Sequence, residues 1–282
     1  MTLKLFITGI KGQLGSELAR QATALGHEVT GGDRPEFDIT DLAQTQAALA
    51  AHHPDVVLHC AAFTHVDEAT RDPNLAYRIN GLGTQNVALA CAEINAPILY
   101  VSSNEVFDGT KTEPYREFDA AHPVNPYAYS KLAGEKFTAH LLNHFYIVRT
   151  SWLTAKGGRN FVHRILQLAD EGKPLRVVTD EVACPTFTSD LASAILKLIA
   201  TGCYGIYHLT NSGYCSRYDF ARRILDLSGR RHIPVEPITL ADYPRLSNPP
   251  KFSALANVCA AALGITLRPW AEALEEFLSS QH

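Results

Sequence analysis

A tyrosine and a lysine lie one helical turn apart in a segment that could transfer protons. Tyr127 and Lys131 occur in the run Asn-Pro-Tyr-Ala-Tyr-Ser-Lys at 125–131, so on a helix they would share one face. A free tyrosine has a pKa of about 10 and is a poor acid–base group at neutral pH. A neighbouring ammonium would favour the phenolate and bring the phenol into a working range. We therefore predict that Tyr127 is a general acid or base. The alternative is an amphipathic helix that carries Tyr and Lys on its surface.

The residues around this pair predict where the helix begins. Asn125 precedes a proline, which disfavours a helical backbone there, and its side chain suits an N-cap. Pro126 suits the first helical position, where an N–H is not needed. Tyr129 is a competing phenol, but no lysine follows it at four residues, so we expect it to be a packing or rim residue.

Glycines recur at every third position near the N-terminus, at Gly9, Gly12 and Gly15. They follow a predicted strand at 3–8 and begin a predicted helix at 13–25. In that setting the first glycine permits a tight turn and the second lets the backbone approach a pyrophosphate. The third lets the helix pack on the strand, with its first amides facing the anion. The pattern predicts a dinucleotide site, and a turn that needs glycine only for packing is the alternative. The positive charge of an oxidised nicotinamide would add to that of Lys131 in favouring the Tyr127 phenolate.

An acid and a base follow the second predicted strand. Asp33 could accept hydrogen bonds from the ribose hydroxyls of NAD, whereas Arg34 could pair with the additional phosphate of NADP. The residues therefore leave the choice between NADP(H) and NAD(H) open, and a solvated pair at a strand end is the alternative. Asp38 and Ile39, one loop further on, could contact the adenine.

Alternating strands and helices are expected to position these residues. Strands are predicted at 3–8, 27–31, 55–60, 97–102 and 145–149, and helices at 13–25, 40–51 with Thr40 as N-cap, 74–93 and 126–142. This order predicts an α/β fold, a Rossmann-like doubly wound parallel sheet with helices on both faces. Ser102 and Ser103 would lie at the carboxyl edge of that sheet. A hydroxyl there could donate to a carbonyl oxygen that gains negative charge, or could serve only in a turn.

The alternation loosens after residue 150. Helices are predicted at 160–170 and 189–200, strands at 175–179 and 206–210, and an ordered loop at 242–254. We therefore predict a dinucleotide-binding domain over 1–150. The remainder, 151–282, would be mainly a smaller C-terminal substrate-binding lobe, interleaved with later elements of the sheet.

The composition suits a chain with a large core and a small-molecule partner. Of its 282 residues 46% are hydrophobic and 19% charged, and the formal net charge is −4. Without a block rich in Lys and Arg we expect no nucleic acid, and without a run of about 18 apolar residues no membrane span. The six cysteines lack C-x-x-C spacing and the N-terminus lacks a signal-peptide pattern. We therefore expect a reducing, cytoplasmic compartment.

Taken together, these motifs resemble the dTDP-4-dehydrorhamnose reductase family of the extended short-chain dehydrogenase/reductase superfamily. The resemblance covers nearly the whole chain. The glycine loop and the Tyr/Lys pair mark only the superfamily. The runs Thr-Ser-Trp at 150–152, PTFTSDLA at 185–192 and HLTNSG at 208–213, in this order, are more specific.

The resemblance implies NAD(P)H-dependent reduction of a nucleotide-linked 4-keto-6-deoxy sugar. The catalytic set would be Ser103, Tyr127 and Lys131. The cofactor would be bound by Gly9, Gly12, Gln13, Leu14, Asp33, Arg34, Asp38, Ile39, Ala61, Ala62, Phe63, Asn80, Tyr127 and Lys131. In that set, Asn80 would steady the catalytic lysine. The sugar would meet Ser103, Asn104, Glu105 and Trp152, and the alternative for Trp152 is a core aromatic.

Two segments depart from the family pattern. Where the family has Ser-Thr-Asp-Tyr-Val-Phe, residues 102–107 read Ser-Ser-Asn-Glu-Val-Phe, and where it has Arg-Pro and an aromatic, residues 250–252 read Pro-Lys-Phe. Both changes lie on the expected sugar side, so the sugar and its nucleotide stay open.

Two other functions also stay open on the same fold. One is an epimerase or dehydratase with tightly held NAD, which Glu105 keeps as an alternative. The other is a non-catalytic NADP-binding regulatory subunit, although Tyr127 and Lys131 are both present. The sequence predicts no metal site and leaves open whether the chain forms a homodimer.

Overall fold

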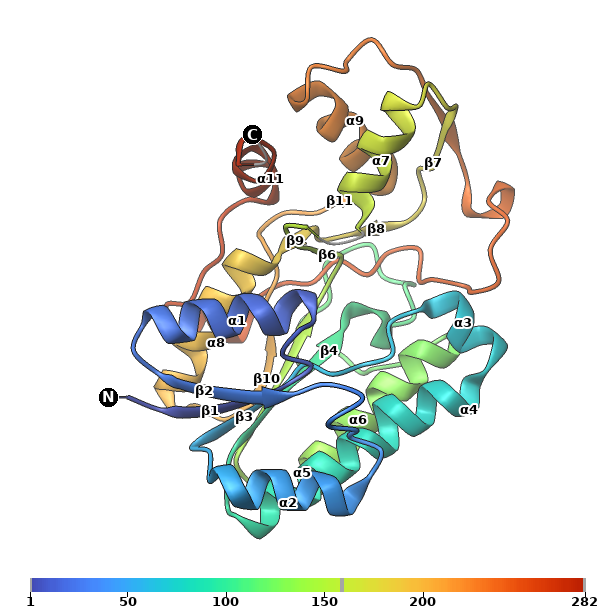
Figure 1. The fold of residues 1–282 in the computed structure, drawn as a ribbon. Helices are drawn as coiled ribbons and strands as arrows, with labels where there is room; N and C mark the ends of the chain where they lie inside the picture. The colour runs from blue at the N-terminus through green and yellow to red at the C-terminus, as the bar shows by residue number, and fades with distance from the viewer. Residues whose placement is uncertain (1, 158–159, 281–282) are drawn as a thin grey trace.

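A six-stranded parallel sheet forms the centre of the computed structural model, which describes residues 2–157 and 160–280 (Figure 1). The strand order is β10-β5-β4-β3-β1-β2. The bounds are β1 Lys4–Thr8, β2 Glu28–Gly32, β3 Val56–His59, β4 Ile98–Ser103, β5 Phe145–Thr150 and β10 Gly205–His208. From β1 the chain runs first to β2 on one side and then to β3 on the other. Such a switch point opens a crevice at the carboxyl ends of the strands. The predicted doubly wound α/β fold is confirmed.

Helices cover both faces of the sheet (Figure 1). On one face lie α1 (Gln13–Ala24) and α8 (Thr188–Thr201), and on the other α2 (Leu42–His52), α5 (Thr84–Glu93) and α6 (Pro126–Leu141). Strand side chains alternate between the two cores. Leu5 and Ile7 pack under α1 and α8, whereas Phe6 packs with α2 and α5. Strands buried on both faces therefore carry the near-continuous apolar runs that the sequence shows.

The two predicted N-caps have different outcomes. Asn125 caps α6 as predicted, because its side chain accepts a hydrogen bond from the amide of Ala128 at 2.9 Å. The N-cap of α2 is Asp41, which accepts from the amide of Gln44 at 3.0 Å, so the prediction of Thr40 is wrong. The Thr40 hydroxyl donates instead to the Asp38 carboxylate. A carboxylate one residue later competes successfully for the helix terminus.

The predicted helix at 74–93 is interrupted. It consists of α4 (Pro73–Ala76), a π-helical segment η1 (Tyr77–Gly83) and α5. A further short helix, α3 (Val66–Arg71), precedes it and was not predicted. A 3₁₀ turn, η2 (Asn104–Val106), follows β4.

Most of the second half of the chain forms a smaller lobe at the carboxyl ends of the strands (Figure 1). Its helices are α7 (Phe161–Asp170), α9 (Arg217–Leu227) and α11 (Trp270–Ser279), and its core includes Phe187, Phe220 and Leu274. The short strand pairs are β6 (Leu153–Thr154) with β9 (Thr186–Phe187), β7 (Leu175–Val178) with β12 (Val235–Ile238), and β8 (Val182–Ala183) with β11 (Cys215–Ser216). A 3₁₀ turn η3 (Leu240–Asp242) and α10 (Val258–Ala262) complete the chain, and β10 and α8 belong to the main sheet. Across the described ranges, no helix combines the length and apolar character that a bilayer crossing requires.

Candidate active site

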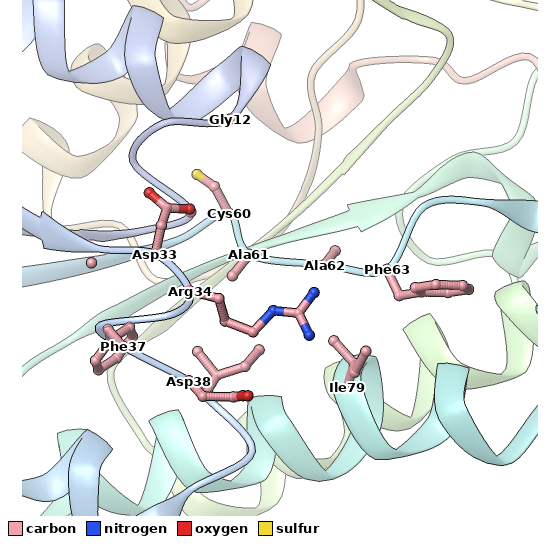
Figure 2. A pocket seen from close by; sticks show the side chains of 13 residues that line it. Gly12, Asp33, Arg34, Phe37, Asp38, Cys60, Ala61, Ala62, Phe63 and Ile79 are labelled. Carbon is pink, nitrogen blue, oxygen red and sulfur yellow. The ribbon is translucent and has the colours of Figure 1, made fainter.

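A cavity of about 230 Å³ opens at the carboxyl ends of β1, β2 and β3 (Figure 2). It brings together many of the predicted cofactor residues, namely Gly9, Gly12, Asp33, Arg34, Asp38, Ile39, Ala61, Ala62 and Phe63. It also takes in Gly32, Phe37, Cys60 and Ile79, which sequence reasoning did not identify. Cys60 and Gly32 adjoin predicted residues at strand ends, so the strand pattern could have found them. Gln13, Leu14, Asn80, Tyr127 and Lys131 do not line it.

The glycine turn has the geometry that a pyrophosphate site requires. Gly9 has a φ of +73°, and a Cβ at Gly15 would lie 2.1 Å from the Gly9 carbonyl oxygen. Gly12 is the N-cap of helix α1, and no side chain caps the first amides of the helix. These amides are therefore available to an anion. Leu14 is buried in the core beneath α1, so any contact it makes with a cofactor would use its backbone.

Asp33 and Arg34 occupy different parts of the cavity. The Asp33 carboxylate accepts a hydrogen bond from the backbone amide of Lys11 at 2.7 Å, which ties the end of β2 to the glycine turn. The Arg34 guanidinium extends across the cavity toward Ala62 and Ile79 (Figure 2). The acid therefore orders the turn, and the base reaches into the space that a cofactor would fill.

Asn80, on η1, connects the cavity to α6. Its side-chain oxygen accepts from the Phe63 amide at 2.7 Å, and its amide nitrogen donates to the Phe63 carbonyl and the Ser130 hydroxyl, each at 2.9 Å. The Ser130 hydroxyl donates in turn to the carbonyl of Tyr127 at 2.6 Å. The resemblance implied that Asn80 steadies Lys131. The structure joins it instead to the turn at Phe63 and to the first turn of α6.

A buried histidine that sequence reasoning missed extends this network. His59 Nε2 lies 3.0 Å from the Thr84 hydroxyl, which donates to the Asn80 carbonyl, and Nδ1 lies 2.6 Å from the Thr8 hydroxyl. The Thr84 hydroxyl must then accept from Nε2, which leaves Nδ1 to accept from Thr8. Burial lowers the pKa of His59 to about 3, so the ring is neutral and keeps this tautomer. A polar residue at the end of a buried strand was the available signal.

Tyr127 and Ser103 meet at the edge of the sheet. Burial is the largest effect on Tyr127 and the Glu105 carboxylate adds to it, so the pKa of the phenol lies well above its usual value despite a hydrogen bond with Ser103. In the protein alone, the Lys131 ammonium makes no contribution to this shift. The predicted lowering of the Tyr127 pKa combines Lys131 with the positive charge of an oxidised nicotinamide, and it stays a prediction.

The Lys131 ammonium is held by β4. Its Nζ donates to the Val101 carbonyl at 2.7 Å and lies 4.3 Å from the centroid of the Tyr100 ring. Burial lowers the pKa of Lys131 to about 7, although Glu135 and Cys60 oppose this effect. Lys131 therefore changes its charge near neutral pH, which an exposed lysine does not do.

The predicted sugar-side residues each have contacts within the protein. The amide of Asn104 is buried and donates to the Ser253 hydroxyl at 2.7 Å. Glu105 accepts from the Asn125 amide at 2.7 Å, and burial raises the pKa of its carboxyl. Trp152 has a φ of +43°. The Arg217 guanidinium lies 3.5 Å from the centroid of its ring. A cation therefore covers one face of the indole that was expected to stack near a sugar.

Comparisons with known proteins are consistent along the whole chain. Residues 3–282 match the family model described as the RmlD substrate binding domain. The chain is 38% identical to the spore coat polysaccharide biosynthesis protein SpsK of Bacillus subtilis, covering 99% of this chain and 98% of that protein. It is 37% identical to dTDP-4-dehydrorhamnose reductase of Mycobacterium tuberculosis, over 98% and 93% of the two chains. The crystal structure of dTDP-4-dehydrorhamnose reductase from Bacillus anthracis in complex with NADP is 37% identical and superposes with a TM-score of 0.95, covering 99% of this chain and 100% of that one.

Proposed function

The chain belongs to the RmlD substrate binding domain family, and from that premise we propose that it is an NAD(P)H-dependent reductase of a nucleotide-linked 4-keto-6-deoxy sugar. One observation carries the proposal. The phenol of Tyr127 and the hydroxyl of Ser103 meet at the carboxyl edge of the sheet, beside a cavity suited to a dinucleotide. The relative from Mycobacterium tuberculosis is named for this reduction.

The cavity and the glycine turn would hold the cofactor. The uncapped start of α1 would bind its pyrophosphate, and Asp33, Arg34 and the turn at 61–63 would surround its adenosine half. When bound, the nicotinamide supplies the hydride, while the protein supplies position and charge.

Tyr127 gives a proton to the carbonyl oxygen as the keto group is reduced. Its raised pKa keeps the phenol protonated at neutral pH, which is the form that a proton donor needs. Ser103 donates to the same oxygen and stabilises its developing charge. Asn80 acts as a positioning residue through Ser130, because it fixes the first turn of α6. Lys131 would bind the nicotinamide ribose, as the resemblance implies.

The two parts of the chain would divide this work. Residues 1–150 would carry the cofactor, and the lobe within 151–282 would cover the sugar. The lobe adjoins the site through Ser253, which bonds Asn104, and through Arg217 at Trp152. The cytoplasmic compartment and the homodimer stay predictions.

Glu105 supports a second candidate function, an epimerase or dehydratase. Its carboxyl has a raised pKa and acts on Tyr127, so it is a further acid–base group beside the phenol. The two functions differ in stoichiometry, because only a reductase consumes one reduced nicotinamide for each sugar.

The test is turnover of a dTDP-4-keto-6-deoxy sugar, followed by the loss of NADPH absorbance. Tyr127→Phe is expected to lower kcat by at least about 100-fold and to leave the Kd for NADPH within about twofold, because the cavity is unchanged. Tyr129→Phe is the matched control, since that phenol is 61% exposed on the same helix. Retention of more than a tenth of the turnover by Tyr127→Phe would contradict the assignment. Conversion of sugar without NADPH loss would favour the epimerase or dehydratase.

A further inference from the structure

An acidic side chain that the reduction does not use lies beside the two donors of the site. Glu105 follows Ser103 by two residues in the 3₁₀ turn η2, and its backbone amide donates to the Ser103 hydroxyl at 3.2 Å. Its carboxylate accepts from the side-chain amide of Asn125 at 2.7 Å. Asn125 is the N-cap of α6, whose first turn carries Tyr127. Glu105 therefore contacts both elements that position the donors.

One oxygen of the Glu105 carboxylate is free. The hydrogen bond from Asn125 ends on Oε2, and across residues 2–157 and 160–280 none ends on Oε1. The two nearest arginines, Arg217 and Arg245, form their ion pairs with Glu181 instead. The Glu105 side chain is half-buried, so water can reach it. A carboxylate with a free oxygen and no ion pair is available to take a proton.

The surroundings make this carboxylate a stronger base than an exposed one. Burial is the largest effect on the pKa of Glu105 and raises it, and the Glu181 carboxylate adds to the rise, against the hydrogen bond from Asn125 and the two arginines. A carboxylate becomes a stronger base as its pKa rises toward the working pH. The charge of Glu105 also acts on the Tyr127 phenol, which agrees with its place beside that residue.

The keto sugar offers such a base a proton. Hydrogens on the two carbons next to a keto group are acidic, because the electron pair left behind can move onto the carbonyl oxygen. In the proposed reduction that oxygen accepts hydrogen bonds from Tyr127 and Ser103, and these donors would stabilise an enolate oxygen in the same way. Each neighbouring carbon is one bond from the carbonyl carbon, so a base that adjoins both donors can reach one of them.

We propose that Glu105 is a general base that exchanges a proton on a carbon next to the keto group, a second activity of this site that rests on the proposed function. The carbon–hydrogen bond breaks, an O–H bond forms on Glu105, and the electron pair passes to the carbonyl oxygen, which Tyr127 and Ser103 hold. The carboxyl then exchanges its proton with water and returns one to the same carbon. The sugar is neither oxidised nor reduced. Return from the same carboxyl keeps the configuration and every carbon–oxygen bond, so this step is neither an epimerisation nor a dehydration.

The test follows deuterium from D₂O into a dTDP-4-keto-6-deoxy sugar by NMR, with NADP⁺ saturating the cofactor cavity so that no reduction occurs. The wild type is expected to label C3 or C5 at least about tenfold faster than the sugar is labelled without protein. Glu105→Gln keeps an oxygen that can accept from Asn125 but removes the base. It is expected to lower the ratio of the exchange rate to the separately measured rate of reduction by NADPH by about tenfold or more. The competing explanation is that Glu105 only holds Asn125.

Glu113→Gln is the matched control, because Glu113 is exposed in the following loop and the substitution removes the same charge. It should leave the ratio within about twofold. If Glu105→Gln does not fold, as judged by its Tm, Glu105→Tyr decides by the same ratio, since tyrosine is the residue of the family pattern at this position.

The outcomes separate this activity from the reduction. An unchanged ratio in Glu105→Gln would overturn the proposal and leave Glu105 as a support for Asn125. A chain that reduces the sugar but labels it no faster than the protein-free reaction would also overturn it, and the proposed function would stand. Recovery of a sugar with inverted configuration would overturn the single-base step and favour the epimerase. Exchange that depends on Glu105 in a chain that consumes no NADPH would support the proton transfer and contradict the proposed reduction.

Discussion

Replacement of Lys131 by methionine should change how the stability of the protein depends on pH. Lys131 is 2% exposed, and its pKa falls from 10.5 to about 7 on folding because its ammonium is buried. Between these two values the unfolded chain holds a proton that the native protein has released. The free energy of unfolding therefore contains a contribution from Lys131 that increases as the pH rises above 7.

The magnitude follows from the two pKa values. One proton difference changes the free energy of unfolding by 1.36 kcal/mol per pH unit. Because native Lys131 is about half protonated at pH 7, the contribution integrates to about 2 kcal/mol between pH 7 and pH 9. The Lys131→Met variant lacks this pH-dependent contribution to the free energy of unfolding. The stability of the wild type relative to the variant should therefore increase by about that amount over this window.

Urea unfolding of both proteins at pH 7, 8 and 9 measures the effect. The difference between the proteins is needed because buried thiols, such as Cys91 and Cys215, have raised pKa values and lower the stability of both as the pH rises. Lys136→Met is the control, since Lys136 is exposed on the same helix. A difference between wild type and Lys131→Met that is constant within about 0.5 kcal/mol would refute the linkage argument.

Two further predictions concern the cofactor cavity. Gly15→Ala should lower the Tm and abolish NADPH binding, measured by nicotinamide fluorescence, because its Cβ would lie 2.1 Å from the Gly9 carbonyl. Gly26→Ala strains the backbone because Gly26 has a φ of +81°, but its Cβ would meet nothing within 4 Å, so it should lower the Tm and keep NADPH binding. An equal loss of NADPH binding in both variants would contradict the packing argument. Arg34→Ala should raise the Kd for NADPH by about tenfold or more and that for NADH by less than about threefold, because only NADPH carries the additional phosphate. An equal increase in the Kd for NADPH and for NADH would show that Arg34 does not bind that phosphate.

Local chemistry accounts for what the sequence predicted well. Asn125 and Pro126 determine the start of α6 by their own side chains, so the placement of Tyr127 and Lys131 on that helix needed no knowledge of the rest of the chain. The requirement for glycine at Gly15 is local in the same way, since a Cβ there would meet the backbone of Gly9 and Ile10, whereas a Cβ at Gly9 would meet the backbone of Cys60 and Ala61 on the neighbouring strand end.

Long-range packing accounts for what the sequence did not show. The pKa of Lys131 is set by its burial against Tyr100 and Val101, about thirty residues away in the chain. Arg217 meets Trp152 only because α9 of the lobe packs beside the end of β5. Helical periodicity also cannot distinguish η1 from α4 and α5, because the hydrophobic pattern continues through all three segments.

The π-helical segment Tyr77–Gly83 has a consequence for how the chain tolerates insertions and deletions. Each residue of a regular α-helix advances the surface by about 100°, and a turn closed from i to i+5 accommodates one residue more than a turn closed from i to i+4. The faces of α4 and α5 are therefore out of phase, with Asn80 at the junction. A homologous chain that is shorter by one residue here could form an unbroken helix. It would then lose either the hydrogen bonds between Asn80 and Phe63 or the packing of α5. The π-helical turn therefore changes the direction in which the following side chains point. It lets Asn80 bond Phe63 while α5 packs on the sheet, which a regular α-helix over the same residues would not allow.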